Sequence, residues 1–255
     1  MAKRNNINPI LLVAASCLLL TAGWLMGPFP ILIFLGLAPL FALTDRKDSH
    51  GTVWEKAEYI LLILAISLVT YSIFHSRSVV VSLVSAIALT VAFVAHTWAA
   101  QTLGKRSGKV TILLFWLAME YLFLKIHPDG GIFLADSLRL QPSWTRWNIH
   151  TGYLGGSLWV LLVNWILYQT FLTGGVIRWP WLLAALLLLA GPILYSLQLD
   201  SAPVTRTDMV NLYTAVPIQS DVSYLARGEF VVRTAAWIST LILLFTFVKS
   251  QTKKR

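Results

Sequence analysis

Glu120 is the residue whose type and surroundings most strongly indicate chemistry, because it is an acid inside the otherwise apolar stretch 115–122. An ionised carboxylate that faced lipid would be costly, so Glu120 is expected to face protein or water. Two interpretations remain open. Glu120 joins helices near the outer interface, paired with Arg146 or Arg233, or it contacts the head group of a substrate.

Two tryptophans follow in the polar stretch 142–153. Trp144 and Trp147 have the spacing of residues that share one face of a helix, which would lie on the outer leaflet. They are typical either of an aromatic belt at head-group depth or of a wall of a site through which lipid enters. We predict a lipid-facing groove on the outer side, built from Glu120, Trp144, Trp147, Tyr153 and Asn164.

Small and polar residues mark the next apolar segment as a helix that packs closely. The Gly-Gly-Ser sequence at 155–157 would let a neighbouring backbone approach. Asn164, two turns further along, is expected to hydrogen-bond across helices. Both features are interpreted first as packing features.

Metal binding is not predicted. His96 stands alone in an apolar segment, where a hydrogen-bonded packing role is more usual than ligation. The other histidines near the outer side lack the i, i+4 or paired spacing that places two imidazoles on one ion; they are His75, His127 and His150.

The sequence also offers few groups for covalent catalysis. Cys17 has no neighbouring base, and no serine lies in a Gly-x-Ser-x-Gly turn. Asp129 and Asp136 are a pair of acids in a loop, where we expect solvated charge rather than acid–base work. No catalytic residue, metal or cofactor is therefore predicted.

Composition identifies the elements that must position these residues. The 255-residue chain is 57% hydrophobic and only 12% charged, with a mean hydropathy of +0.71. Soluble domains carry about 25% charged residues. The net charge of +9 therefore belongs to the ends of membrane spans, and nucleic-acid binding is excluded because no basic soluble face is available.

Long apolar runs predict an all-α polytopic membrane protein with about eight transmembrane helices. Charged residues, proline or glycine separate the runs. The second and fifth runs are short. The predicted spans are 10–26, 29–43, 57–74, 79–98, 110–124, 154–172, 179–197 and 231–248.

The distribution of Lys and Arg predicts the orientation of these spans. An even number of spans divides the 20 basic residues into 13 on the side of the termini and 7 on the other side. The positive-inside bias then places both termini in the cytoplasm. Residues 1–255 form a single transmembrane domain in this interpretation, and the long loops 125–153 and 198–230 face outward.

Three stretches of the chain resemble one family, the apolipoprotein N-acyltransferases. The most specific combines Glu120 and its neighbours at 116–122 with residues 142–147, 151–159 and Asn164. The other two are residues 27–40, with their Gly-Pro-Phe-Pro and Leu-Ala-Pro-Leu sequences, and residues 226–230, Ala-Arg-Gly-Glu-Phe, leading to Arg233. Together they cover most of the membrane part of that family.

The resemblance implies a bacterial cytoplasmic (inner) membrane protein of lipoprotein biosynthesis. In that family an outer nitrilase-like domain, inserted between the last two helices, carries a Glu-Lys-Cys triad that moves an acyl chain from phospholipid to a lipoprotein. Here the interval is only 198–230, and no residue matches the triad. The region 126–140 and residues 149–150, Ile-His, also depart from the family pattern.

Three functions follow from this resemblance and from the span pattern. The leading hypothesis is a membrane domain that is inactive alone and binds phospholipid or lipoprotein, with Arg233 and the five groove residues as candidate contacts. The alternative is the membrane subunit of a split N-acyltransferase, completed by a separate nitrilase-like chain. A small transporter is disfavoured, because we find no internal repeat.

Overall fold

The computed structural model of the chain describes residues 8–26, 30–45, 53–104, 110–126, 131–173, 178–208 and 222–252, without the side chains of 222–230. Within these residues the protein is all-helical and contains no strand. Its longer helices overlap every predicted apolar run. They are α1 (Pro9–Leu25), α2 (Ile33–Thr44), α3 (Val53–Phe74), α4 (Val79–Leu103), α6 (Thr111–Ile126), α7 (Gly155–Leu167), α8 (Trp179–Gln198) and α10 (Val222–Thr252).

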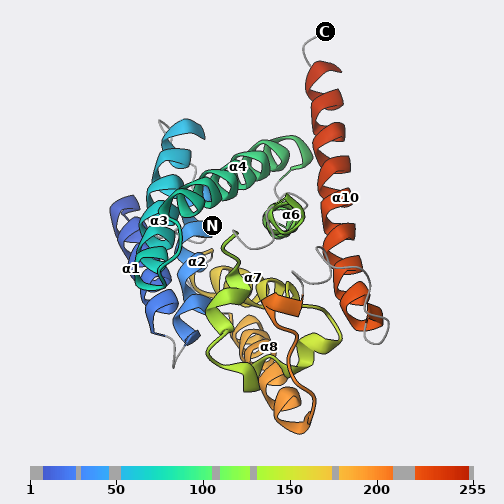
Figure 1. Cartoon of the computed structure of the whole chain (residues 1–255). Helices are drawn as coiled ribbons and strands as arrows, with labels where there is room; N and C mark the ends of the chain where they lie inside the picture. Colours follow the sequence, from blue (N-terminus) through green and yellow to red (C-terminus); the bar gives the residue numbers. More distant parts are fainter. Residues whose placement is uncertain are drawn as a thin grey trace.

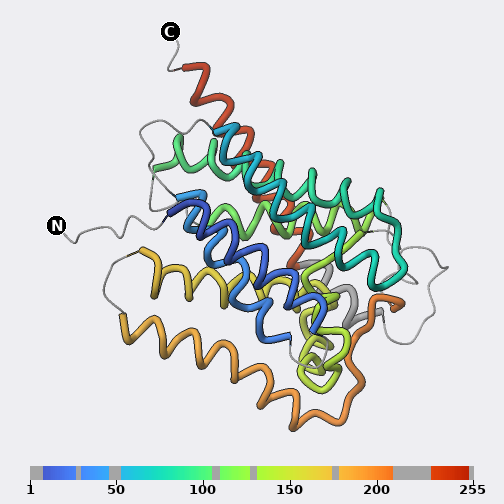
Figure 2. Tube along the Cα trace, turned by 90° about the vertical axis from the view of Figure 1, so that its left-hand side faces the viewer, coloured from blue at the N-terminus to red at the C-terminus, as the bar shows by residue number. Residues whose placement is uncertain are grey.

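Successive helices run in alternate directions (Figure 2), so the beginning of α1 and the end of α10 lie at one end of the bundle. We call this end the termini end. There Lys249 Nζ of α10 donates to the carbonyl of Thr102 at 2.9 Å, and the Tyr168 hydroxyl donates to Asp45 Oδ2 at 2.5 Å. The opposite end, which we call the loop end, carries residues 131–153 and the turn between α3 and α4.

Among the described residues, five helices are long and apolar enough to cross a membrane: α3, α4, α7 with its π-helical extension η5 (Tyr168–Leu172), α8 and α10. The other three are shorter, because α1 has 17 residues, α2 has 12 and α6 has 16. At 1.5 Å per residue, α6 is about 24 Å long, less than the roughly 30 Å of a hydrocarbon core. The count of eight spans therefore stays a prediction.

Small residues let α1 and α2 pack closely. A Cβ on Gly23 would lie 2.7 Å from the backbone nitrogen of Ile33, and one on Gly36 would lie 2.7 Å from Leu20 Cδ2. Such contacts are shorter than van der Waals packing allows. Glycine at these two positions is therefore what permits the two backbones to approach.

The helices differ in how much of their surface the protein covers. In Figure 1, α7 lies near the centre of the bundle, whereas α8 and α10 lie at separate margins. The outer faces of α8 and α10 carry exposed large apolar side chains such as Leu187 and Leu241, at 71% and 61% exposure. Apolar faces of this kind are typical of helices that contact lipid.

Two parts of the predicted outward loops are not loops. Helix α10 begins at Val222, whereas the sequence predicts a loop up to residue 230. The difference arises because an apolar run marks only the apolar part of a helix, and α10 continues beyond that part. Residues 131–153 contain three short 3-10 helices, η2 (Leu134–Leu138), η3 (Pro142–Trp144) and η4 (Arg146–Ile149).

Candidate functional site

Residues 131–153 fold back into the loop end of the bundle, and we call them the folded loop. Phe133, Leu134 and Leu138 are at most 3% exposed and belong to the main hydrophobic core. The segment is therefore not a solvated loop. Gly152, with φ of 77°, makes the turn that leads from the folded loop into α7.

Three side chains satisfy the backbone of the buried part of the folded loop. Glu120 Oε1 accepts from the amide of Leu134 at 2.9 Å, and Ser157 Oγ accepts from that of Ala135 at 3.0 Å. The amide of Phe133 donates to Asp136 Oδ2, also at 3.0 Å. Buried non-helical backbone is stable only if such groups are paired. Glu120 thus holds the folded loop in place.

Glu120 is 1% exposed and is not paired with the basic residues proposed from the sequence. Besides Leu134, its Oε1 accepts from Trp116 Nε1 at 2.9 Å. Arg146 instead donates to the carbonyl of Leu199, and Arg233 is exposed on α10. An ion pair between Glu120 and either arginine is therefore wrong.

The second oxygen of Glu120, Oε2, has no hydrogen-bond partner in the described parts of the chain. Glu120 lines a cavity of about 10 Å³. That volume is about the minimum that one water molecule needs. The cavity at Glu120 has room for one water molecule and not for a lipid head group.

Asp136 is the centre of a buried polar network, so the prediction that it is a solvated charge is wrong. It is 4% exposed. Its Oδ1 accepts a hydrogen bond from the Tyr153 hydroxyl, and its Oδ2 lies 2.8 Å from Arg206 Nη1 in an ion pair. Burial, with the adjacent Asp136 charge, raises the pKa of Tyr153 well above its ordinary value. Asp129, the other acid of the predicted pair, lies outside the described residues.

The two tryptophans of the folded loop do not share one helix face. Trp144 ends η3 and Trp147 lies in η4, with Thr145 between the two helices. Ser196 of α8 ties both: its hydroxyl donates to the Trp144 carbonyl at 3.0 Å and accepts from the Trp147 amide at 3.2 Å. Trp147 also packs edge-on against Trp159.

An apolar groove lies beside Trp147, between α8 and α10. Its volume is about 240 Å³, and α6, α7 and the folded loop complete its walls. Whole-ligand pockets run to roughly 300–1,000 Å³, so this groove accommodates part of a ligand. Representative lining residues are Leu117, Trp147, Leu162, Leu188, Pro192 and Val231.

Two polar atoms at the groove are unsatisfied. Trp147 Nε1 and Thr151 Oγ1 are buried and have no hydrogen-bond partner within the described residues. Both residues line the groove. A Cβ on Gly155 would lie 2.1 Å from Thr151 Oγ1, so glycine there is what leaves room for the threonine. A buried tryptophan N–H normally finds an acceptor, and no described residue supplies one here.

A second cavity, of about 530 Å³, lies beside the folded loop, and we call it the arginine chamber. Of the described residues, three arginines line it, one from the α3–α4 turn, one from the folded loop and one from the segment after α8. It shares no lining residue with the groove. Its lining includes Arg77, Arg139, Asn148, Tyr153, Val204 and Arg206.

The structure does not gather the predicted site residues in one place. Trp147 lines the groove and Tyr153 lines the arginine chamber, whereas Trp144 and Arg233 line neither. Asn164 is fully buried between α7 and α2. The three chamber arginines were not predicted as site residues, because in the sequence they stand out only as outer charges. Thr151 was not predicted either, because it is an ordinary polar residue with no signal in its spacing.

His96 and Cys17 are placed as packing residues would be. His96 Nδ1 lies 2.7 Å from Thr111 Oγ1, which ties α4 to α6 as a packing residue would. Cys17 is half-buried in α1. The described residues contain no group of three His, Cys, Asp or Glu side chains that could hold a metal ion. His127 lies outside the described residues.

No family model, curated protein or solved structure matches this chain.

Proposed function

We propose that this protein is a membrane-embedded lipid-binding protein that holds one acyl chain of a phospholipid, or of an acylated lipoprotein, in the groove between α8 and α10. It transfers no acyl group by itself. The resemblance of its sequence to the membrane domain of apolipoprotein N-acyltransferases is consistent with this class of ligand. The proposal includes eight spans, cytoplasmic termini and location in a bacterial inner membrane.

The observation that carries the proposal is the combination of an apolar groove with two unsatisfied polar atoms. Leu162, Leu188 and Val231 offer a surface that suits hydrocarbon. Trp147 Nε1 donates, and Thr151 Oγ1 either donates or accepts. An acyl ester has this pattern, because its carbonyl oxygen accepts hydrogen bonds and its chain is apolar.

The position of the groove supports entry from the bilayer. Val231, on its rim, is 42% exposed. The neighbouring outer faces of α8 and α10 are apolar. A chain held in the groove can therefore keep the rest of its lipid in the surrounding bilayer, which agrees with a volume below that of a whole-ligand pocket.

Blocking the groove tests the proposal. Val231→Trp fills its rim, and Ile238→Trp is the matched control, because Ile238 is 40% exposed on the same helix and does not line the groove. Native mass spectrometry of the detergent-purified protein measures the retained phospholipid or lipopeptide. We expect Val231→Trp to lose most of it and Ile238→Trp to keep it. Equal retention by both variants and the parent contradicts groove binding.

The alternative, a membrane subunit of a split N-acyltransferase, rests on the position of residues 198–230, where the family resemblance places an inserted catalytic domain. A transfer assay separates the two. The purified chain with phospholipid and a diacylated lipopeptide is expected to yield no triacylated product, since the described residues contain no activated nucleophile. Product that appears only on adding a separate nitrilase-like chain favours the alternative. Product from this chain alone that is lost in Cys17→Ala contradicts both.

A further inference from the structure

The arginine chamber has an excess of positive charge among the described side chains. Arg77, Arg139 and Arg206 line it. Asp136 is the carboxylate that pairs with one of them, Arg206, at 2.8 Å. Neither Arg77 nor Arg139 forms an ion pair with a described carboxylate. Asp208, beside the chamber wall, is occupied by the amide and hydroxyl of Thr205 at 2.7 and 2.8 Å.

Two of the arginines are held in place by aromatic rings. The guanidinium of Arg206 lies 4.8 Å from the ring centre of Phe133, and its side chain is 12% exposed. That of Arg77 lies 5.9 Å from the ring centre of Tyr71. Stacking on an aromatic face orients the planar guanidinium before any ligand arrives. The chamber therefore presents preorganised donors.

The far wall of the chamber is also fixed. Asn148 Oδ1 accepts from the Val204 amide at 2.8 Å, and Asn148 Nδ2 donates to the Val204 carbonyl at 2.9 Å. This pair of hydrogen bonds attaches the segment after α8 to the folded loop. Arg206, two residues later, is attached in turn through Asp136. The position of Arg206 thus depends on two independent anchors.

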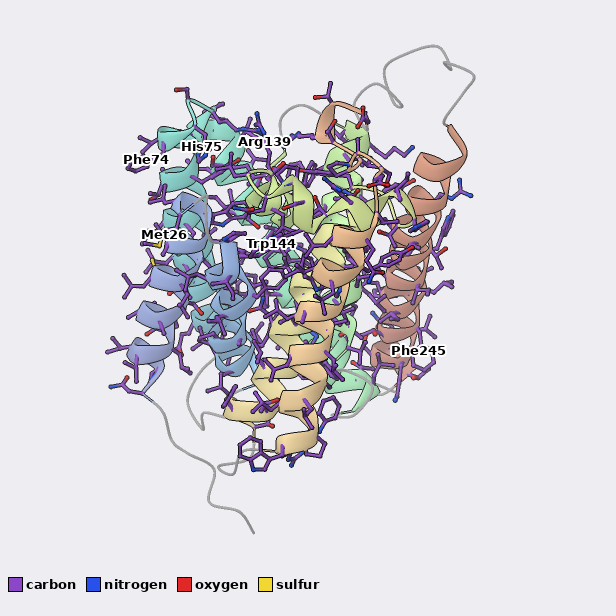
Figure 3. All side chains as sticks on the ribbon, turned by 90° about the horizontal axis from the view of Figure 1, so that it is seen from below. Met26, Phe74, His75, Arg139, Trp144 and Phe245 are labelled. Carbon is purple, nitrogen blue, oxygen red and sulfur yellow. The ribbon has the colours of Figure 1, made fainter. Side chains whose placement is uncertain are left out.

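We infer that the arginine chamber is a binding site for a phosphate-type anion, reached from the loop end of the bundle. Three guanidinium groups from three separate segments suit a tetrahedral oxyanion, whose oxygens accept hydrogen bonds in several directions. The volume of about 530 Å³ lies within the range of whole-ligand pockets. Figure 3 shows Arg139 at the same end of the bundle as His75 of the α3–α4 turn.

This site goes beyond the proposed function and does not depend on the groove, since the two cavities share no lining residue. The phosphate group has two possible sources: the head group of a phospholipid, or a soluble phosphate compound. Both present the same oxyanion to the chamber. The experiment must therefore measure the anion site first and then compare the two sources.

Calorimetric titration of the purified full chain in an uncharged detergent tests the inference, with inorganic phosphate and short-chain phosphatidic acid as separate probes. Arg139→Gln is the main variant, because Arg139 is exposed and we expect its replacement to leave the fold unchanged. Arg77→Gln is the second variant. Arg178→Gln is the control, since it removes the same charge from an exposed residue at the start of α8.

We expect saturable binding by the parent that is at least tenfold weaker in Arg139→Gln and Arg77→Gln, a change of about 1.4 kcal/mol. Arg178→Gln should bind as the parent does. Tighter binding of phosphatidic acid than of inorganic phosphate assigns the site to a lipid head group, and equal binding assigns it to a soluble phosphate compound. The inference is overturned if the parent binds neither probe, or if Arg139→Gln binds as well as Arg178→Gln. Loss of groove binding in Val231→Trp would leave these results unchanged.

Discussion

Several buried polar side chains in this protein hydrogen-bond to backbone groups of nearby segments. Glu120 pairs with the amide of the folded loop at Leu134, and Asp136 with that at Phe133. The sequence identifies Glu120 as a buried acid, because a carboxylate in an apolar helix must find a polar neighbour. It does not identify the partner, since a backbone amide leaves no mark in residue type.

Asn164 makes the most complete set of such contacts. Its Oδ1 accepts from the amides of Leu37 and Ala38 at 2.8 and 3.1 Å, and its Nδ2 donates to the carbonyls of Ile33 and Val160, both at 2.9 Å. The predicted hydrogen bond across helices is thus present. The bonds to Leu37 and Ala38 lie in α2 just before Pro39, which has no N–H to donate to the carbonyl four residues earlier.

Asn164→Leu is expected to destabilise the protein strongly. The variant removes the side-chain acceptor of two buried α2 amides, and a buried amide without a partner costs roughly 1–3 kcal/mol. Thr170→Val is a suitable control, because Thr170 is equally buried and loses only a local bond to Ile166. Thermal unfolding in detergent should show a much lower midpoint for Asn164→Leu alone. Similar midpoints for the two variants would mean that Asn164 does not support α2.

Tyr153 should make the protein sensitive to alkaline pH. Its pKa in the folded protein is raised above the ordinary 10.0 by burial. Below pH 10 the phenol is protonated in both states and stability is unaffected. Above pH 10 the unfolded chain ionises while the folded one does not, so stability falls as pH rises toward the folded pKa.

The comparison of parent and Tyr153→Phe checks this effect. The variant is less stable at neutral pH, because it loses the bond to Asp136. Its unfolding midpoint should fall less steeply than that of the parent between pH 10 and 11. Parallel pH curves would show that Tyr153 ionises normally.

At the scale of elements, apolar runs predict the helices well and the connections poorly. Helix α4 begins at Val79 and α8 at Trp179, as the sequence indicates, because each start is marked by a polar residue before a long apolar run. The folded loop is different. Its burial depends on Glu120, Asp136 and Ser157 meeting three amides, which only the three-dimensional arrangement reveals.

The contact between α1 and α2 offers a test at this scale. Gly36→Ala places a Cβ against Leu20, whereas Gly191→Ala in α8 places one where no heavy atom lies within 4 Å. Alanine otherwise favours a helix over glycine by about 0.5–1 kcal/mol. We expect Gly36→Ala to lower the thermal midpoint and Gly191→Ala to keep or raise it. The same rise in both variants would show that α1 and α2 are not in close contact.

For the whole molecule, the alternate directions of the helices (Figure 2) place the beginning of α1 and the end of α10 together, and the excess of basic residues on that side predicts that it is cytoplasmic. The sequence therefore reaches the class of protein and a topology. It does not reach the two cavities. The groove depends on how α8 and α10 are placed in the bundle. The chamber depends on Arg77 and Arg206 lining one cavity, although they come from segments far apart in the chain.

Reporter fusions measure the topology. An alkaline-phosphatase fusion at Ser201 should be active, because that residue follows α8 at the loop end, and a fusion after Thr252 should be inactive. A cytoplasmic reporter should give the reverse pattern. An inactive phosphatase at Ser201 with an active cytoplasmic reporter at the same position would overturn the orientation.

The measurement that tests lipid binding in the groove most directly is native mass spectrometry of Trp147→Phe beside Trp165→Phe. Each tryptophan has a buried Nε1 with no hydrogen-bond partner among the described residues, but only Trp147 lines the groove. Phenylalanine keeps the aromatic packing and removes the N–H donor in each. We predict that the parent and Trp165→Phe retain a phospholipid through detergent purification and that Trp147→Phe retains markedly less. Equal retention by all three proteins, or no retained lipid in the parent, contradicts the account.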